Sequence, residues 1–166
     1  MRDSRSIEDL VGGDVDREQV FRFFVFFSRF EFALKRCGYT RSSRGHAEPN
    51  WDKLAEELKG SLRIDAEPKL SEQIDYMISQ PPGKQVIRDN TIAFKEMKRG
   101  NESEARWLLR LAQQVRNNLF HGGKYPFARG PEPERDPQLL RAAISVLERC
   151  LVLKPNLDAC FWETGV

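Results

Sequence analysis

The stretch VRNNLFHGGK, residues 115–124, ends a helical pattern that begins near Asn101. Arg116 and His121 are five residues apart, which places them roughly 140° apart around a helix axis, although a long arginine side chain can still swing towards the ring. Asn117 lies one turn before His121, so its amide can orient the imidazole. The two glycines that follow allow a left-handed C-cap, which leaves His121 in the last turn of the helix.

This segment brings together groups suited to a phosphodiester. The negative end of the helix dipole favours a charged imidazolium, and histidine titrates near neutral pH, so His121 can act as a general acid or base. Arg116 can clamp a phosphate or stabilise the charge that develops on it. No metal is needed if the nucleophile is a neighbouring ribose 2′-hydroxyl. An arginine and a histidine at a helix C-terminus also commonly cap carbonyl groups, and spacing alone favours that interpretation.

The order Arg116-Asn117-(three residues)-His121 resembles the R-x4-H motif of the HEPN family, in which a polar residue often follows the arginine directly. The longer string RNNLFHGGK, at the end of the expected helix, is similar to strings that recur in bacterial HEPN proteins. The segment FSRFEFALKR, residues 27–36, is similar to the first long helix of such proteins. Together with the all-helical pattern, the likeness spans most of the chain.

The resemblance implies an all-α, HEPN-like antiparallel bundle of five to six helices that forms a two-fold homodimer. It also implies a metal-independent endoribonuclease without a cofactor, with a composite site at the dimer interface that cleaves RNA through the ribose 2′-hydroxyl. Such an enzyme is a toxin, with an antitoxin protein as a further partner, or a ribonuclease of phage defence or stress response. The resemblance implies that Arg116 contacts the scissile phosphate and that His121 transfers protons. It implies that Asn117 orients or polarises the reacting groups, and that Lys124 and Asn118 bind RNA.

Glu31 is a candidate for a supporting role. It lies on a phenylalanine-rich helix, where a buried carboxylate without a cation would be costly. Arg116 is one partner that would meet this need. A surface ion pair with Lys35, four residues further along the same helix, is at least as good an interpretation.

The composition favours one soluble domain. The chain has 166 residues, of which 40% are hydrophobic and 31% charged, enough for a core over residues 14–166 after a flexible polar lead at 1–13. The formal net charge of +2 does not indicate a nucleic-acid-binding protein, so any basic surface must be local. This charge mildly favours a rival function, a non-catalytic helical module that binds RNA or a protein, or that dimerises.

The cysteines and the chain start predict a cytoplasmic protein. Cys37, Cys150 and Cys160 are odd in number and widely spaced, which argues against a disulfide framework or a zinc site and is typical of a reducing cytosol. With only two histidines in the chain, we expect no metal. The polar N-terminus and the short apolar cluster at 23–27 predict neither a signal peptide nor a membrane span.

Helical spacing of apolar residues, with caps and Pro/Gly breaks, predicts the elements. A first helix over about 16–37 has Asp14 or Asp16 as its cap and Gly38 beyond its end, and it is apolar on more than one side, which favours a central position or a partner chain. Asn101 and Glu104 resemble a capping box that opens the motif helix. Residues 84–98 show weaker amphipathicity and no strand-like alternation, so we expect no sheet. The remaining expected helices are 51–62, 70–79 and 138–153.

Overall fold

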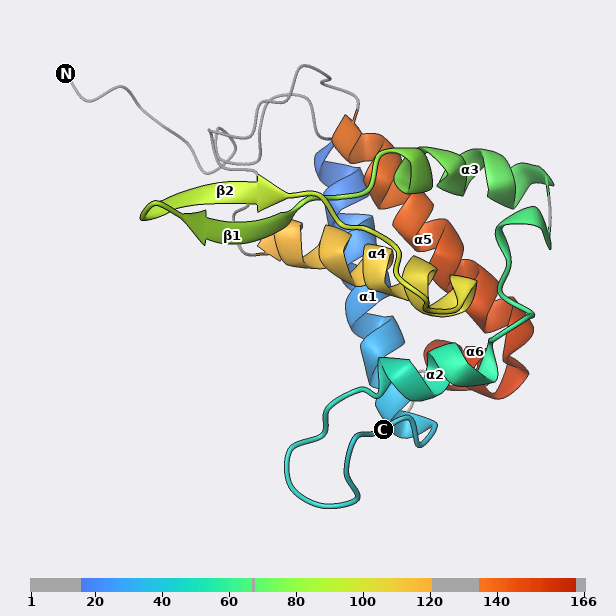
Figure 1. Ribbon diagram of the computed structural model, residues 1–166. Coiled ribbons are helices and arrows are strands. Elements are labelled where there is room, and N and C mark those ends of the chain that lie inside the picture. Colours follow the sequence, from blue (N-terminus) through green and yellow to red (C-terminus); the bar gives the residue numbers. More distant parts are fainter. Residues whose placement is uncertain (1–15, 67, 121–134, 164–166) are drawn as a thin grey trace.

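The computed structural model describes residues 16–66, 68–120 and 135–163, and it is mostly helical (Figure 1). The expectation of a helical fold is confirmed, whereas the expected lead at 1–13 lies outside the described residues. The elements follow one another as α1 (Arg17–Arg36), α2 (Trp51–Glu57), a 3-10 turn (Ile64–Ala66), α3 (Pro68–Ser79), β1 (Lys84–Arg88), β2 (Thr91–Lys95), α4 (Glu104–Phe120), α5 (Arg135–Leu153) and α6 (Pro155–Trp162).

Helix α1 begins and ends where local chemistry dictates. The Asp16 carboxylate accepts a hydrogen bond from the backbone N–H of Glu18 at 3.0 Å, so the expected cap is confirmed. Gly38 follows the helix with φ of +80°, a left-handed conformation that glycine adopts without strain. The side chains of Phe23, Phe27, Phe30, Ala33 and Leu34 are buried on α1. These residues make α1 a central element of the fold, against which α5 and α6 pack.

Helix α5 completes the core because α3, α4, α1 and α6 all contact it. Helix α4 contributes an apolar face that includes the buried Leu108, Leu111 and Val115. The N-terminus of α4 differs from the expected capping box. The helix begins at Glu104, and the Ser103 hydroxyl accepts the backbone N–H of Arg106 at 3.3 Å, so Ser103 takes the capping position that the sequence analysis gave to Asn101.

The expectation of no sheet was wrong. Strands β1 and β2 form an antiparallel hairpin that extends away from the helices (Figure 1). Asp89 and Asn90 connect the strands, with φ values of 51° and 59°. Positive φ at both central residues is the geometry of a type I′ turn, whose twist matches that of the flanking strands. Helix α6 at Pro155–Trp162 was not among the expected helices.

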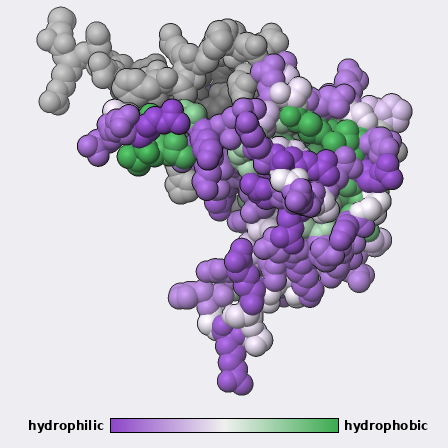
Figure 2. All heavy atoms as spheres, in the orientation of Figure 1, coloured by the Kyte–Doolittle hydropathy of each residue, from purple (hydrophilic) through white to green (hydrophobic). Residues whose placement is uncertain are grey.

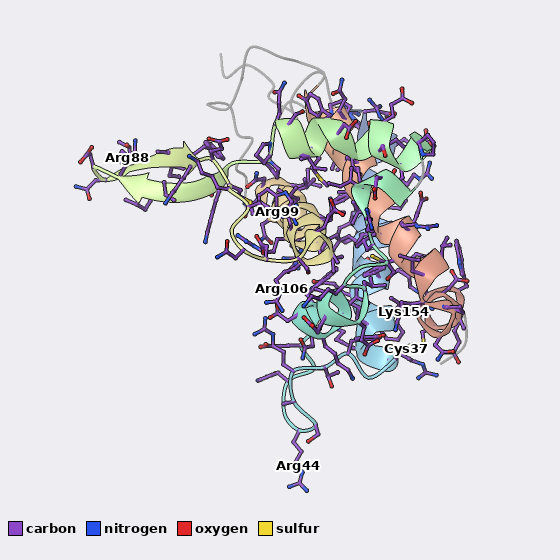
Figure 3. The ribbon with its side chains drawn as sticks, turned by 45° about the vertical axis from the view of Figure 1, so that its right-hand side comes forward. Cys37, Arg44, Arg88, Arg99, Arg106 and Lys154 are labelled. Carbon is purple, nitrogen blue, oxygen red and sulfur yellow. A yellow bond between two sulfur atoms is a disulfide. The ribbon has the colours of Figure 1, made fainter. Side chains whose placement is uncertain are left out.

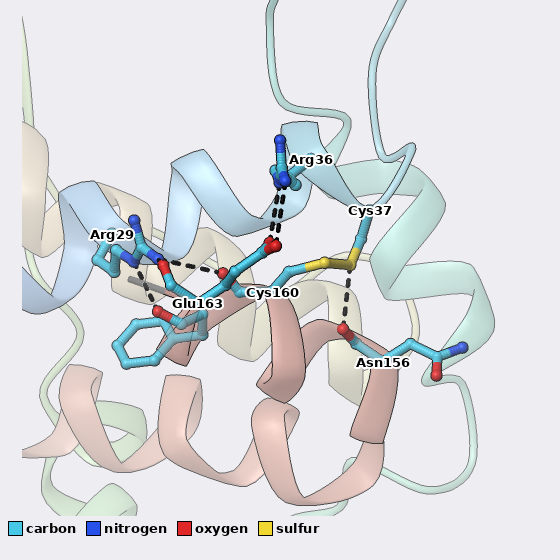
Figure 4. The surroundings of a disulfide bond; sticks show 7 residues. Arg29, Arg36, Cys37, Asn156, Cys160 and Glu163 are labelled. Carbon is cyan, nitrogen blue, oxygen red and sulfur yellow. Dashed lines mark hydrogen bonds and ion pairs between the residues drawn. A yellow bond between two sulfur atoms is a disulfide. The ribbon is translucent and has the colours of Figure 1, made fainter. Parts of the chain in front are cut away.

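The argument against disulfides was also wrong, because Cys37 and Cys160 form one, with their Cα atoms 6.5 Å apart. The bond joins the residue after α1 to α6 (Figure 4). Two arginines of α1 reinforce the contact: Arg36 Nε lies 3.0 Å from the Glu163 carboxylate, and Arg29 Nε donates to the Phe161 carbonyl at 2.6 Å. One basis for the cytoplasmic expectation is thereby removed.

The remaining element boundaries differ by a few residues from those expected. Helix α2 ends at Glu57 instead of near residue 62, and α5 begins at Arg135 instead of near residue 138. In α6, Phe161 is buried whereas Trp162 is exposed. Over the described ranges, every helix is too short or too polar to cross a membrane.

Candidate functional site

The Arg116 guanidinium lies between two aromatic rings. Its Cζ atom is 5.6 Å from the centre of the Phe27 ring on α1 and 5.5 Å from the centre of the Phe120 ring, one turn further along α4. A cation over an aromatic face is attracted by the negative face of the ring, and arginine also stacks on it. The two rings therefore hold the guanidinium at the contact between α1 and α4, with about a third of the side chain (34%) exposed.

Two polar groups fix the guanidinium further. Arg116 Nη1 donates to Asn117 Oδ1 at 2.9 Å, and Nη2 lies 3.5 Å from Glu31 Oε2. Of the two partners considered for Glu31, the structure places Arg116 beside it. Because arginine carries five N–H donors and described side chains take two, donors remain for a ligand. A partly exposed, pre-oriented guanidinium of this kind can bind an anion with little loss of side-chain entropy.

The Asn118 side chain points away from Arg116, towards the start of the hairpin, and is buried. Its Oδ1 accepts from Gln114 Nε2 at 2.8 Å, and its Nδ2 donates to the carbonyl of Gly83 at 2.9 Å. Both halves of the amide are thus bonded within the chain, and Asn118 ties the start of the hairpin to α4. This geometry gives Asn118 a structural role, and with only 6% of the residue exposed its RNA contact stays a prediction.

His121 and Lys124 lie outside the described residues. The structure therefore brings together Arg116, Asn117 and Glu31 from the expected site. Helix α4 is described to Phe120, the residue directly before His121. The structure therefore shows the surroundings of Arg116, the first residue of the motif, and His121 is the next residue in the sequence after the described end of α4.

An exposed apolar stripe on α1 borders this site. Phe21, Phe24, Val25 and Phe32 are exposed, and at 100° per residue all four lie within roughly one third of the helix circumference. The Phe24 ring contacts the Phe120 ring at a centroid distance of 5.4 Å, which links the stripe to the rings that hold the guanidinium. These four side chains place a continuous apolar stripe on the surface of α1 beside the candidate site.

The sequence analysis missed the two rings beside Arg116. Phe120 could have been found, because it lies four residues after Arg116 on one helix face. Phe27 could not, because its contact with Arg116 depends on how α1 lies against α4. The resolved pKa shifts lie elsewhere. Lys154 and then Tyr39 bond to Glu57 and lower the pKa of its carboxyl, and the Arg36 hydrogen bond lowers the pKa of Glu163.

Three comparisons bear on the relatives of this chain. No family model matches it, and neither a curated protein nor a solved structure does. The functional argument therefore depends on the site and on the motif. Among the described residues no group of three or more histidine, cysteine, aspartate or glutamate side chains is placed to hold a metal ion.

Proposed function

We propose that the chain is a metal-independent endoribonuclease of the HEPN type. The observation that carries the proposal is the Arg116 guanidinium, which lies partly exposed between the Phe27 and Phe120 rings and contacts Glu31 and Asn117. It stands at the end of the helix whose sequence continues into His121. The resemblance assigns the arginine to the scissile phosphate and the histidine to proton transfer, and this setting of Arg116 supports that assignment.

The reaction follows from these roles. The ribose 2′-hydroxyl attacks the adjacent phosphorus as His121 takes its proton, and the bond from phosphorus to the 5′-oxygen breaks. The leaving 5′-oxygen takes a proton from water, to which the protonated His121 returns one, and the products end in a 2′,3′-cyclic phosphate and a 5′-hydroxyl. Arg116 stabilises the negative charge that builds on the phosphate oxygens. Glu31 keeps the guanidinium oriented, and Asn117 helps to orient it by accepting a hydrogen bond from Arg116 Nη1.

The experiment is an RNA cleavage assay in EDTA with two matched substrates. We expect the unmodified RNA to be cut to cyclic-phosphate ends, and an RNA with a single 2′-O-methyl group at the cut site to resist cutting there, because the nucleophile is blocked. DNA of the same sequence should also resist. Cleavage of the methylated RNA at an undiminished rate would rule out this mechanism.

The alternative is a non-catalytic helical module that binds RNA or a protein. The exposed stripe on α1 favours an interaction role in either case, and turnover in the assay distinguishes the two functions. If turnover is found, the resemblance places the enzyme among toxins, which have an antitoxin partner, or among nucleases of phage defence and stress response.

The assembly that we propose is a two-fold homodimer formed through the α1 stripe. A specific dimer should bury on the order of 1,200 Å² or more in total, and the stripe offers an apolar surface beside Arg116 that a second copy would cover. Such pairing sets the two Arg116 sites near the same interface, as the composite site requires.

We expect Phe21→Asp to give a monomer in sedimentation at tens of micromolar and to abolish cleavage. Val152→Asp on α5 is the control, because Val152 and Phe21 are both 67% exposed. The control should remain dimeric and active, since an exposed substitution outside the interface changes stability little. A chain that sediments as a monomer without either substitution contradicts the proposed assembly.

A further inference from the structure

The two faces of the β1–β2 hairpin differ in chemistry. The register pairs Lys84 with Lys95 and Arg88 with Thr91. Since alternate residues of a strand share a face, these two pairs lie on one face of the hairpin, and Ile87, Ile92 and Phe94 lie on the other. We call Lys84, Arg88 and Lys95 the cationic face. Figure 2 shows the apolar atoms of the hairpin gathered beside its hydrophilic ones.

The cationic face is unfavourable in the isolated chain. Like charges directly opposite each other across two strands destabilise the pair, and Lys84 stands directly opposite Lys95. None of the three cations has an ion pair with a described carboxylate. Four cations near α2 and on α4 contrast with them, because they have a carboxylate within 4 Å: Lys59–Glu56 at 3.6 Å, Arg63–Asp65 at 2.6 Å, Arg106–Asp52 at 3.2 Å and Arg110–Glu102 at 2.5 Å. An anionic ligand would relieve the repulsion on the hairpin.

The hairpin is attached to α4, the helix that carries Arg116. The Gly83 carbonyl, directly before β1, accepts hydrogen bonds from Gln114 and Asn118, which lie within one turn of Arg116 along α4 but roughly 160° around the helix axis from it. From this anchor the strands extend past the C-terminal end of α4 (Figure 1). Figure 3 shows Arg88 far out on the hairpin and Arg99 nearer to α4. The cationic face therefore begins beside the motif helix and continues outwards from it.

We propose that the cationic face of the hairpin binds the sugar–phosphate backbone of RNA and leads the strand towards the C-terminal end of α4, the helix that carries Arg116. The proposal rests on RNA being the substrate of the proposed ribonuclease. The strands are five residues long, about 17 Å, a length over which a nucleic-acid strand presents several phosphates. Contacts of this kind position the backbone without reading its sequence, so single-stranded DNA should bind the same face without being cut.

The test measures binding of a fluorescent single-stranded RNA by anisotropy over a range of salt concentrations. All chains carry His121→Ala, so the RNA stays intact. Lys84→Gln/Arg88→Gln/Lys95→Gln is compared with Lys59→Gln/Arg63→Gln/Arg106→Gln, which removes the same three charges from paired positions. We expect the hairpin variant to weaken binding on the order of tenfold and to reduce the slope of log K against log salt by about 2, whereas the control keeps the slope.

A second measurement separates lost binding from lost folding. Because Lys84→Gln/Lys95→Gln removes the cross-strand repulsion, this variant should unfold at the same temperature as the unmodified chain or at a higher one, while it binds RNA more weakly. In chains with His121 intact, the hairpin variant should need more RNA for half-maximal cleavage and should keep the maximal rate.

The outcomes distinguish this inference from the proposed function. If RNA binding depends on the hairpin and no RNA is cleaved, the result supports the inference and contradicts the proposed ribonuclease function. If RNA is cleaved and the hairpin variant binds RNA with the affinity and salt slope of the unmodified hairpin, the result overturns the inference and leaves the proposed ribonuclease function standing. An acidic protein that binds the cationic face in place of RNA also overturns it.

Discussion

Arg116→Ala, His121→Ala and the double variant should all cut RNA at nearly the same low rate, about 10³-fold or more below the unmodified chain. The reason is that both residues act in one transition state, so once either is lost the other has little left to contribute. The measurement is the initial rate of RNA cleavage in EDTA, compared at equal concentrations of folded dimer. A double variant whose loss equals the product of the two single losses would show that the residues act independently.

Arg116→Lys tests the geometry of the guanidinium separately from its charge. Lysine keeps the positive charge, but it has no planar array of donors that can bond to Asn117, Glu31 and a phosphate together, and it stacks less well on the Phe27 and Phe120 rings. We therefore expect Arg116→Lys to be severely impaired while the fold and the dimer persist.

Arg110→Lys is the matched control for this substitution. Arg110 lies on the same helix, forms an ion pair with Glu102 and has its Cζ atom 5.6 Å from the centre of the Trp107 ring. Its setting repeats that of Arg116 outside the motif, so its replacement should leave the cleavage rate unchanged. Equal losses at the two positions would assign the Arg116 effect to folding instead of catalysis.

The second large effect concerns the disulfide. Cys37→Ala/Cys160→Ala should lower the free energy of unfolding by about 3 kcal/mol, because a cross-link between distant residues restricts the unfolded chain. The two cysteines are 123 residues apart, which is a long loop to close. Urea unfolding monitored by circular dichroism measures the loss, and neither residue of the Arg36–Glu163 ion pair is changed by the substitutions.

A reductant supplies the control for the disulfide. Reduction should destabilise the unmodified chain by a similar amount and leave the double variant unaffected. Cys150 should not interfere, because complete burial raises the pKa of its thiol far above the ordinary range and the reactive thiolate does not form. A chain whose stability is the same with and without reductant contradicts the expected contribution of the bond.

Local signals in the sequence predicted α1 to α5, whereas α6 was not predicted. Asp16, Gly38 and the spacing of the phenylalanines define α1 because they act within one or two turns. The motif helix was predicted for the same reason, and only its cap moved to Ser103. The pairing of Glu31 with Arg116, 85 residues later, remained one of two alternatives because it depends on how two helices meet.

The hairpin and the disulfide were missed for different reasons. Val86 and Ile87 are adjacent, so the strand lacks the alternation that marks a half-buried sheet. Asp89-Asn90 between two short runs rich in β-branched residues was nevertheless a usable turn signal. The disulfide left no such signal, because its pairing depends on α6 lying beside the end of α1, and spacing along the chain does not reveal that proximity.

The Cys37–Cys160 bond divides the chain into a closed covalent ring and two tails. The hairpin, Arg116 and the motif stretch belong to the ring, whereas Phe27 and Glu31 belong to the N-terminal tail. The candidate site is therefore assembled where a tail meets the ring. A protease that nicks the backbone once between Cys37 and Arg116 would leave both fragments in one molecule, with the Arg116 fragment still linked to the tail that holds it, until the disulfide is reduced.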